Sequence, residues 1–463
     1  MAKILIYELN EVPWRVVDFY LQHRPYAYLH QFMKNASHLT THTVDSGELH
    51  PWSTWPTMHR GASNDTHEIR YINQDRSCGD AAPPVWQLLA SAGKTVGICG
   101  SLQSYPPMEN SNALFHVPDT FAPGSETRPE RYSAFQRVNL KLTGENKAVA
   151  KGYGFTDMLD GAQLLRSGVS IKTGFRLMQH LLKERADSKH KALRATMQAH
   201  VAFDVFLDAL KQTKPDYAAV FSNHVAGMMH RYWKYAFPED FNYSLADSDF
   251  DRFHSQSILK AMDIFDEQLG VLEQFANREG YDIVVSSSMG QEAVERGEYI
   301  PELKLDDESL LASVMGFQGA FRMLLAMQPD VALEFVSQQK LQEFVQALPR
   351  LADSEGQQIL VKRYDEQGLT LNISVCRSKA IAESGTLYLD DKPIPMGDLG
   401  FSLIERDQGT GYHQPEGIWL WKGAEQPRTS GRALVDSPLW QDSWHYLIIN
   451  QLGGSGVDSA SLF

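Results

Sequence analysis

The chain has 463 residues, of which 43% are hydrophobic, so it is long enough for a large buried core and for up to three lobes. Its formal net charge of −14 argues against binding to a nucleic acid polymer, and its three cysteines, which lack paired spacing, argue against a disulfide framework. The acidic Glu8 follows the first short apolar run, and no stretch of about 18 uninterrupted apolar residues occurs, so we expect a cytoplasmic protein with neither a signal peptide nor a membrane span.

The first elements predict an alternating α/β arrangement. Residues Ile4 to Tyr7 form a short apolar run of the kind found in buried parallel strands. Asn10 and Glu11 follow at its carboxyl end, which is where open α/β sheets bind their ligands. Alternating strands and helices predict a parallel sheet with helices on both faces. The next expected elements are a helix near 14–21, a strand at 39–44, a helix over 85–92 and a strand at 95–99.

The stretch from Ser46 to Gly61 concentrates hydroxyl and imidazole groups. Pro56 suits the first turn of a helix, which would place Ser53 or Thr54 at the N-cap. A hydroxyl there faces unpaired backbone N–H groups and the positive end of the helix dipole, where an oxyanion or phosphate is favoured. Thr54 is therefore a candidate nucleophile, and the alternative is that it only caps the helix.

Further along, two stretches depart from the alternating pattern. Residues 121–194 mix glycine, serine and basic residues with amphipathic pieces such as 168–184, and we interpret them as a helical cap insertion. Residues 292–407 are interpreted as an α+β insertion, with a helix near 332–348 and a β-hairpin formed by 359–364 and 369–375.

The remaining segments form one discontinuous α/β core domain made of residues 1–120, 195–291 and 408–463. Helix 258–275 carries apolar residues at steps of four and three and ends at Gly280, which predicts one buried stripe. The other expected core elements are helix 197–210, strand 217–221 with the polar loop 222–231, strand 281–285 with Ser286 to Gly290, the loop 409–417, strand 418–421 and a final helix near 439–452.

The order of the polar loops resembles that of the alkaline phosphatase superfamily, in particular its type I phosphodiesterase and nucleotide pyrophosphatase branch. Thr54-Trp-Pro-Thr, with Gly61 and His67, is similar to the nucleophile segment of that family. His230-Arg-Tyr-Trp is similar to its second metal-ligand loop, and Gly411 to Gly417 is similar to the loop of its last metal-binding histidine. The resemblance covers the sheet segments but neither insertion. It implies an alkaline-phosphatase-like, mostly parallel sheet sandwiched by helices, and chemistry on phosphate esters.

The chain also departs from the family pattern, which has two metal ions held by Asp and His. Asn10 stands where the family has Asp, Ala226 replaces the Asp of the second loop, and Ser287-Ser288 replaces an adjacent Asp-His pair. His230 and His413 remain, so the resemblance implies at most one well-supported ion.

A divalent ion needs three or four protein donors, and zinc accepts imidazole nitrogen and carboxylate oxygen. His230 and His413, completed by His224 or Glu11, would give a three-ligand site with an open position, which is the composition of a catalytic zinc site. The expected cofactor is therefore one divalent metal ion, with zinc as the first choice. The alternative is that these histidines are hydrogen-bonding groups in a site that binds no metal.

An attack of Thr54 on phosphorus would place growing negative charge on the phosphoryl oxygens, which cations or N–H donors must stabilise. The guanidinium of Arg60 or Arg231 presents a fork matched to phosphate, although both could equally form surface ion pairs. His59 and Asn10 complete the set of expected substrate contacts.

The sequence thus predicts a hydrolase or transferase of phosphate esters, with a phosphodiester as the expected substrate and Thr54 as the nucleophile. Its ligand would be a phosphorylated small molecule or a glycan-linked phosphate. One alternative is a non-catalytic member of the fold that binds a phosphorylated or glycan ligand in the former cleft, which the replacements at Ala226 and Ser287-Ser288 favour. Another is a metal-free transfer with His59 or His224 as general base. The substrate and the oligomeric state stay open.

Overall fold

The computed structural model describes residues 3–72, 74, 76–144, 164–246, 248–324, 326–327, 329–363, 366, 368–404, 409–424 and 433–434. The chain divides into two compact units. Unit 1 consists of Met1–Tyr71, Arg76–Glu295 and Gly409–Phe463, and unit 2 consists of Ile72–Asp75 and Arg296–Gln408. Residues 121–194 belong to unit 1, and their separation as a helical cap stays a prediction.

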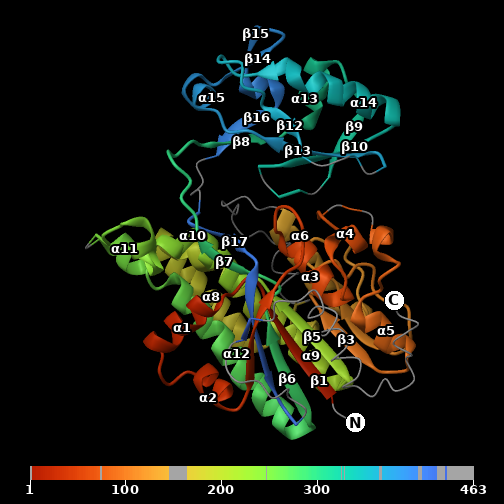
Figure 1. Cartoon of the computed structure of the whole chain (residues 1–463), viewed down its shortest axis with the longest axis vertical. Coiled ribbons are helices and arrows are strands. Elements are labelled where there is room, and N and C mark those ends of the chain that lie inside the picture. Colours follow the sequence, from red (N-terminus) through yellow and green to blue (C-terminus); the bar gives the residue numbers. More distant parts are fainter. Residues whose placement is uncertain are drawn as a thin grey trace. The chain divides into compact units, whose positions relative to one another are not determined.

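Unit 1 is built on one central sheet. Its strands are β1 (Lys3–Leu9), β2 (Ser37–His42), β3 (Val96–Cys99), β4 (Ala113–Val117), β5 (Tyr217–Ser222), β6 (Tyr281–Ser286), β18 (Glu416–Lys422) and β19 (Ala433–Leu434). Among the described residues their order is β19-β2-β18-β6-β1-β5-β3-β4 (Figure 1). Strand β1 is parallel to both neighbours, β3 is parallel to β4 and β5, and only β18 runs antiparallel to the strands beside it. The predicted mostly parallel α/β sheet is confirmed.

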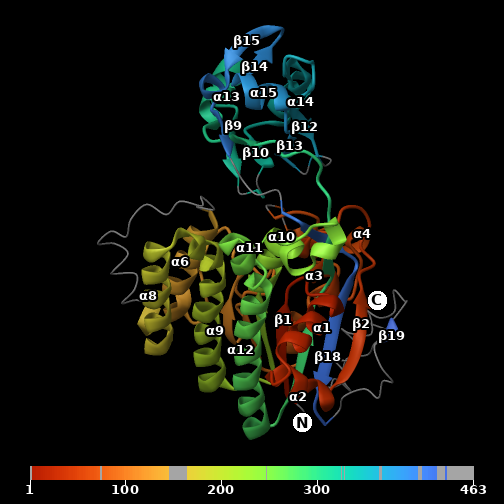
Figure 2. The same cartoon turned by 90° about the vertical axis from the view of Figure 1, so that its left-hand side faces the viewer.

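Helices cover both faces of this sheet (Figures 1 and 2). The side chains of β1 alternate between two hydrophobic cores: Ile4 and Ile6 pack with helices α3 and α5, whereas Leu5 and Tyr7 pack with α9, α10 and α12. The helices of unit 1 are α1 (Trp14–His23), α2 (Tyr28–Lys34), α3 (Pro51–Arg60), α4 (Asn64–His67), α5 (Val85–Ser91), α6 (Ser133–Gly144), α8 (Ile171–Ala186), α9 (Arg194–Thr213), α10 (His224–Ala236), α11 (Asp249–His254) and α12 (Ser257–Glu279), with 3-10 turns η1 (Arg76–Gly79), η2 (Glu130–Tyr132), η3 (Ser188–Leu193) and η4 (Pro238–Phe241).

Helix α12 confirms the predicted apolar stripe. Ile258, Met262, Phe265 and Leu269 are fully buried, and the helix ends at Gly280, which has a left-handed φ of 75°. The final helix predicted near 439–452 lies outside the described residues.

The register of the sheet brings three polar loops to one edge. Glu8 of β1 pairs with Phe221 of β5 and with Ser286 of β6, so these three strands end at the same level. The residues that follow them are therefore neighbours: Asn10 and Glu11 after β1, Asn223 and His224 after β5, and Ser287 and Ser288 after β6. A further antiparallel pair, β7 (Gly290–Ala293) and β17 (Gly411–Gln414), continues from this edge.

Unit 2 has its own hydrophobic core and three small antiparallel sheets, ordered β12-β13-β10-β9, β11-β14-β15 and β16-β8 among the described residues. The predicted hairpin is confirmed, because β12 and β13 pair antiparallel. The helix predicted over 332–348 is wrong in its first part, which forms β10. The elements of unit 2 are β8 (Glu302–Leu305), α13 (Glu308–Met315), β9 (Phe321–Leu324), β10 (Val331–Phe335), α14 (Gln338–Ala347), η5 (Leu348–Arg350), β11 (Leu351–Ala352), β12 (Leu360–Lys362), β13 (Thr370–Val375), α15 (Lys379–Ser384), β14 (Thr386–Leu389), β15 (Lys392–Pro395), η6 (Met396–Leu399) and β16 (Phe401–Ile404).

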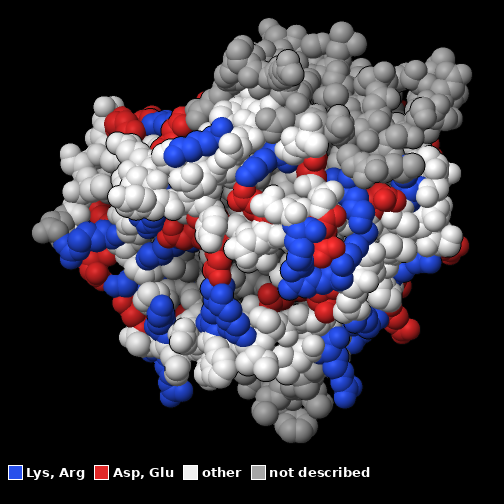
Figure 3. Space-filling view, turned by 90° about the horizontal axis from the view of Figure 1, so that it is seen from below, with Lys and Arg blue, Asp and Glu red and all other residues white. Residues whose placement is uncertain are grey.

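Charge is distributed evenly over the face seen from below in Figure 3, where Lys and Arg side chains are interspersed with Asp and Glu. None of the helices in the described part of the chain combines the length and the hydropathy that a membrane-spanning helix requires.

Candidate metal-binding site

Three of the predicted ligands lie together at the polar edge of the sheet. Glu11, His230 and His413 each offer one ligand atom, and these atoms lie within 4.8 Å of one another. Oε2 of Glu11 is 2.9 Å from Nε2 of His230 and 3.4 Å from Nε2 of His413. No second group of three such ligands occurs among the described residues. The segments that supply them are far apart in sequence, and the sheet edge brings them together.

The backbone of Glu11 adopts a conformation that is uncommon for a residue with a side chain. Its φ is 60°, in the left-handed region, and its carboxylate is 2% exposed. Strained backbone of this kind concentrates at functional sites, because the surrounding structure has to maintain it. In this conformation the buried carboxylate of Glu11 faces the imidazoles of His230 and His413.

The orientation of His230 is set by the segment Gly409–Gly411. Nδ1 of His230 donates a hydrogen bond to the carbonyl oxygen of Gly411, at 2.9 Å, so Nε2 faces Glu11. A carbonyl oxygen that accepts a hydrogen bond from one imidazole nitrogen is the usual way in which proteins aim the other nitrogen at a metal. The close approach requires glycine: a Cβ at Gly411 would lie 2.5 Å from the carbonyl oxygen of Met229, and one at Gly409 would lie 2.6 Å from that of His230.

Between these two glycines, Thr410 inserts into the hydrogen-bond ladder of helix α10. Its N–H donates to the carbonyl oxygen of His230 at 2.7 Å, and its Oγ1 accepts from the N–H of Lys234 at 3.0 Å. These two bonds replace the bond that Lys234 would otherwise donate to His230, and the backbone of Tyr232 is non-helical at φ −123°, ψ 17°. The loop that carries His413 is therefore fastened to the helix that carries His230.

Gln291 supports Glu11 from strand β7, and the sequence reasoning missed it. Its Nε2 donates to Oε2 of Glu11 and to the carbonyl oxygen of Ala226, and in the β7–β17 pair Gln291 lies opposite His413. The available signal was its position in the polar loop after β6, three residues beyond Ser288. The side-chain amide of Gln291 has neither a charge nor an imidazole nitrogen, and these are the features that indicate a metal ligand in a sequence.

Asn10 binds the other carboxylate oxygen. Its Nδ2 donates to Oε1 of Glu11 at 2.7 Å and to Oδ1 of Asn223 at 2.6 Å, while its Oδ1 accepts from Nε1 of Trp55 at 2.7 Å. Asn10 is 1% exposed, so the prediction that it contacts substrate is corrected: it positions Glu11 and links β1 to helix α3.

The charges within the cluster stabilise one another. Burial alone would raise the pKa of Glu11, but the charges and hydrogen bonds of His413 and His230 outweigh it and hold this pKa well below the usual range. Burial would likewise lower the pKa of His413, but Glu11 outweighs it and raises that pKa. The carboxylate is therefore ionised at neutral pH.

Two imidazole nitrogens and one carboxylate oxygen form the donor set of a three-ligand catalytic zinc site, so these residues fit a divalent ion.

Thr54 lies in helix α3 but does not cap it, which corrects the prediction. Pro51 takes the first helical position and His50 the N-cap, so Pro56 lies inside the helix. The backbone N–H of Thr54 is already bonded to the carbonyl oxygen of His50, at 2.9 Å. The side chain is fully buried, and its Oγ1 lies 2.8 Å from Oγ of Ser288.

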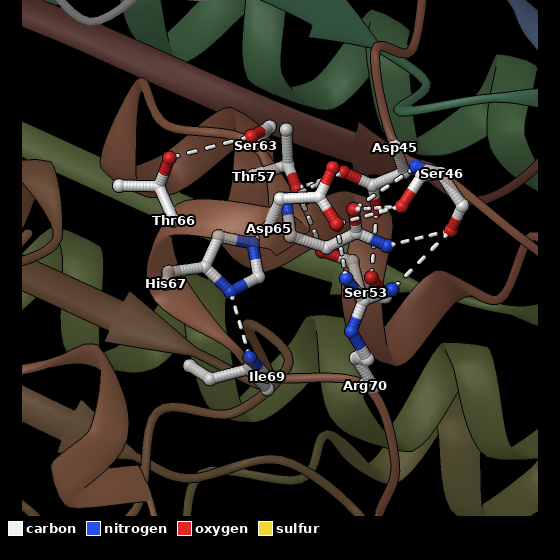
Figure 4. A network of polar contacts seen from close by, with 11 residues as sticks. Asp45, Ser46, Ser53, Thr57, Ser63, Asp65, Thr66, His67, Ile69 and Arg70 are labelled. Carbon is white, nitrogen blue, oxygen red and sulfur yellow. Dashed lines mark hydrogen bonds and ion pairs between the residues drawn. The ribbon is translucent and has the colours of Figure 1, made fainter. Parts of the chain in front are cut away.

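The start of helix α3 is held by a buried polar network around Asp45 (Figure 4). The hydroxyls of Ser53 and Thr57 donate to its two carboxylate oxygens. The N–H of Ile69 donates to Nδ1 of His67 at 3.0 Å, so the proton of His67 is on Nε2, which donates to Oγ1 of Thr57 at 2.8 Å. Burial lowers the pKa of His67 to about 3. Because this neutral imidazole donates to Thr57, it supports the hydroxyl and does not act as its base.

Two predicted substrate contacts on α3 point into the protein interior and are corrected. Nε2 of His59 lies 2.8 Å from Oε1 of Glu8, and both side chains are 1% exposed. The guanidinium of Arg60 donates to the carbonyl oxygens of Gly79 and Ala82, at 2.5 and 2.6 Å. His59 lies on the face of α3 that packs against the sheet, and Arg60 binds the backbone of the loop that contains Gly79 and Ala82.

His224 is not a ligand of the cluster, which corrects another prediction. At the first position of α10 it faces α12, where Nε2 lies 3.0 Å from the carbonyl oxygen of Ala261 and Nδ1 lies 2.8 Å from Oγ of Ser222. Burial lowers its pKa to about 3. Both His59 and His224 are enclosed, so neither is placed to act as a general base on a substrate. Arg231 is half-buried in α10, and its role in binding phosphate stays a prediction.

The two serines that follow β6, Ser287 and Ser288, also have structural partners. Oγ of Ser287 donates to the carbonyl oxygen of Leu9 and accepts from the N–H of Val12 at 3.3 Å. Ser288 is bonded to Thr54. These hydroxyls join the loops after β1 and β6 to helix α3.

No protein-family model and no curated protein matches the sequence, whereas solved structures match it over nearly its whole length. Phosphonoacetate hydrolase from Sinorhizobium meliloti, in complex with phosphonoformate, is 13% identical over 97% of this chain and 95% of that chain, with a TM-score of 0.42. Murine ectonucleotide pyrophosphatase/phosphodiesterase 5, in complex with AMP, is 14% identical over 98% and 95%, with a TM-score of 0.43. Alkaline phosphatase from the Antarctic bacterium TAB5, in a mutant with magnesium bound, is 10% identical over 97% and 96%, with a TM-score of 0.36.

These three proteins are members of the alkaline phosphatase superfamily, the family whose motifs the sequence resembles. The first two are, by name, a hydrolase and a phosphodiesterase, and they were solved with a phosphonate and with a nucleotide monophosphate. Because the identities are low and the TM-scores lie below 0.5, this likeness carries no argument about the chemistry of the present chain. Its own residues have to support the function.

Proposed function

We propose that the protein is a phosphate-ester hydrolase or transferase that binds one divalent metal ion through Glu11, His230 and His413. One observation carries this proposal: three buried or half-buried donors of the right chemistry lie within 4.8 Å of one another, and neighbouring groups position Glu11 and His230. Zinc suits two imidazole nitrogens and one carboxylate oxygen, and a site with three protein ligands keeps a position open for substrate or water. We propose a phosphodiester or another phosphorylated small molecule as the substrate class.

When bound, the ion would supply Lewis-acid stabilisation of a phosphoryl oxygen. The protein groups have separate tasks. Asn10 and Gln291 hold the carboxylate of Glu11, and Gly411 holds His230, so the donors need little rearrangement. We propose Thr54 as the nucleophile, with the hydroxyl of Ser288 as the hydrogen-bond partner that orients it.

Metal analysis and turnover together test the proposal. The wild-type protein, purified without chelator, should contain about one zinc or other divalent ion per chain and should hydrolyse an activated phosphodiester such as bis(p-nitrophenyl) phosphate. His230→Ala should lose the ion and the activity, whereas His23→Ala, at an exposed histidine of helix α1, should keep both. Metal in the His230→Ala protein, or none in wild type, contradicts the proposed site.

A second candidate function is a non-catalytic protein that binds a phosphorylated or glycan ligand near the same cluster. The observation that favours it is the complete burial of Thr54, whose hydroxyl and N–H are both hydrogen-bonded within the protein. Thr54→Ala separates the two functions. Loss of turnover with unchanged metal content supports the hydrolase, whereas stabilisation by phosphodiesters or sugar phosphates without any turnover in wild type supports the binding protein.

A further inference from the structure

Helix α8 presents a row of large apolar side chains to solvent. Ile171, Phe175, Met178 and Leu182 are 71%, 58%, 49% and 61% exposed. They recur at steps of four, three and four residues, so they form one line along one face of the helix. Exposed apolar patches of a few hundred Å² on a soluble protein mark interaction sites.

The opposite face of α8 attaches the helix to unit 1. Thr173, His180 and Glu184 are its buried residues, and Arg194 of α9 forms an ion pair with Glu184. The helix packs against α9 and η3, and Figure 2 shows it at the side of the row formed by α9 and α12. The apolar row therefore lies on the side of α8 opposite the side that packs against α9 and η3.

The charged residues beside this row are basic. Lys172, Lys183 and Arg185 are exposed on α8, and Arg166 is exposed just before it, whereas the one acidic residue of the helix, Glu184, is buried. Lys172 is paired with Glu267 of α12, and the described residues give no ion pair for the other three. The exposed charged residues of α8 itself are thus all basic, in a chain whose formal net charge is −14, and exposed acidic side chains stand only beside the helix, at Asp187 and Glu267.

The charge pattern decides between the possible occupants of this face. Pairing of α8 with a second copy of itself would bring basic residues against basic residues, which disfavours a dimer. A ridge of Ile, Phe, Met and Leu flanked by Lys and Arg is instead the composition of helices that lie in the interface of an anionic bilayer. We propose that α8 docks the protein on an anionic lipid surface. The four apolar side chains enter the headgroup boundary, and Arg166, Lys183 and Arg185 contact lipid phosphates.

This proposal is independent of the chemistry at the metal site and can be tested on the whole chain without an activity assay. Sedimentation with vesicles of phosphatidylcholine alone, and of phosphatidylcholine mixed with phosphatidylserine, measures the partition coefficient. We expect wild type to bind the mixed vesicles, to bind the neutral ones far less, and to be released by salt. A basic residue near an anionic surface contributes about fivefold to binding, so Lys183→Glu with Arg185→Glu should reduce it by about 25-fold or more.

Phe175→Ser with Leu182→Ser tests the apolar row separately and should also abolish binding to the mixed vesicles. The matched controls are Tyr26→Ser, at a side chain that is 97% exposed, and Lys392→Glu, on an exposed position of β15, and both should bind as wild type. All these positions are exposed, so the thermal midpoint should stay unchanged and report correct folding.

Three results would overturn the proposal. The first is that wild type fails to bind the mixed vesicles or that the α8 variants bind them as well as wild type does. The second is a dimer in light scattering that Phe175→Ser with Leu182→Ser dissociates, which would assign the row to a second copy. The third is retention on immobilised polyglutamate without binding to vesicles, which would assign this face to an acidic protein.

Discussion

The substitution Glu11→Gln tests the charge at the centre of the site. Four side-chain groups contact the carboxylate, and all of them present nitrogen: Nδ2 of Asn10 lies on Oε1, while Nε2 of Gln291, His230 and His413 lie on Oε2. A glutamine of the same shape must turn its NH2 group toward at least one of these donors, whichever way the amide is oriented. The variant therefore loses both the negative charge and one or more hydrogen bonds.

The magnitude follows from the burial of the pair. Removing one partner of a buried ion pair costs about 3–5 kcal/mol of stability, and the side chain of His230 is 33% exposed and thus partly solvated, so we expect about 3 kcal/mol for Glu11→Gln at neutral pH in chelator. In unit 1, with about 350 residues, a loss of this size lowers the thermal midpoint by roughly 4 °C. Glu239→Gln is the matched control, because Glu239 pairs with Arg15 at a site where its side chain is 65% exposed, and we expect less than about 1 kcal/mol there.

Tryptophan fluorescence is the appropriate assay, because all nine tryptophans lie outside residues 296–408 and therefore report on unit 1. Midpoints are measured in chelator, so that metal binding does not contribute. A Glu11→Gln protein that unfolds within 1 °C of wild type would refute the reasoning, since the carboxylate would then contribute nothing to the cluster.

Three further predictions concern positioning, pH and metal. Thr410→Val removes the oxygen that accepts from the N–H of Lys234 and should lower zinc affinity at least about tenfold. Thr410→Ser keeps this oxygen and should keep the zinc affinity of wild type. Equal zinc titration curves for the two variants would count against a positioning role of Thr410. The pKa of His224 is about 3 in the folded protein, below its ordinary value of about 6.5, so the unfolded state binds the extra proton first and stability falls as the pH drops from about 6.5 towards 3. His224→Asn should flatten this acid limb by up to about 1.4 kcal/mol per pH unit, and an unchanged slope in urea titrations would exclude His224 as its source. Zinc at a hundred times its dissociation constant should stabilise unit 1 by about 2.7 kcal/mol, and chelator should reverse the shift in the fluorescence midpoint.

The positions of the three cluster residues could be predicted from sequence because strand ends decide them. Glu11 lies two residues after β1, His230 lies in the helix that follows β5, and His413 lies in β17, directly before β18. Parallel strands that end at one level bring such residues to a common edge, whatever separates them along the chain.

The remaining roles depended on contacts that no local pattern contains. Nothing near His224 indicates that Nε2 will meet the carbonyl of Ala261, 37 residues further on. The cap of helix α3 was misplaced because Pro51 and Pro56 both suit a first turn, and only the packed structure decides between them. Gln291 was missed because its importance comes from its contact with Glu11, not from its residue type.

The extent of the helix near 332–348 shows the same limit for secondary structure. Val331–Phe335 forms β10 because it pairs with β9 and β13, while helix α14 begins after Ser337, whose side chain accepts from the N–H of Lys340. Apolar residues in both segments fit a helical spacing, and pairing with distant strands overrides it.

The most direct test of the central claim is a calorimetric titration of the metal-free wild-type protein with zinc, repeated on His230→Ala, His413→Ala and Glu11→Gln. The structure predicts one ion bound per chain in wild type and at least about a hundredfold weaker binding in each variant. Zinc that binds the three variants with the wild-type affinity and stoichiometry would contradict the proposed site.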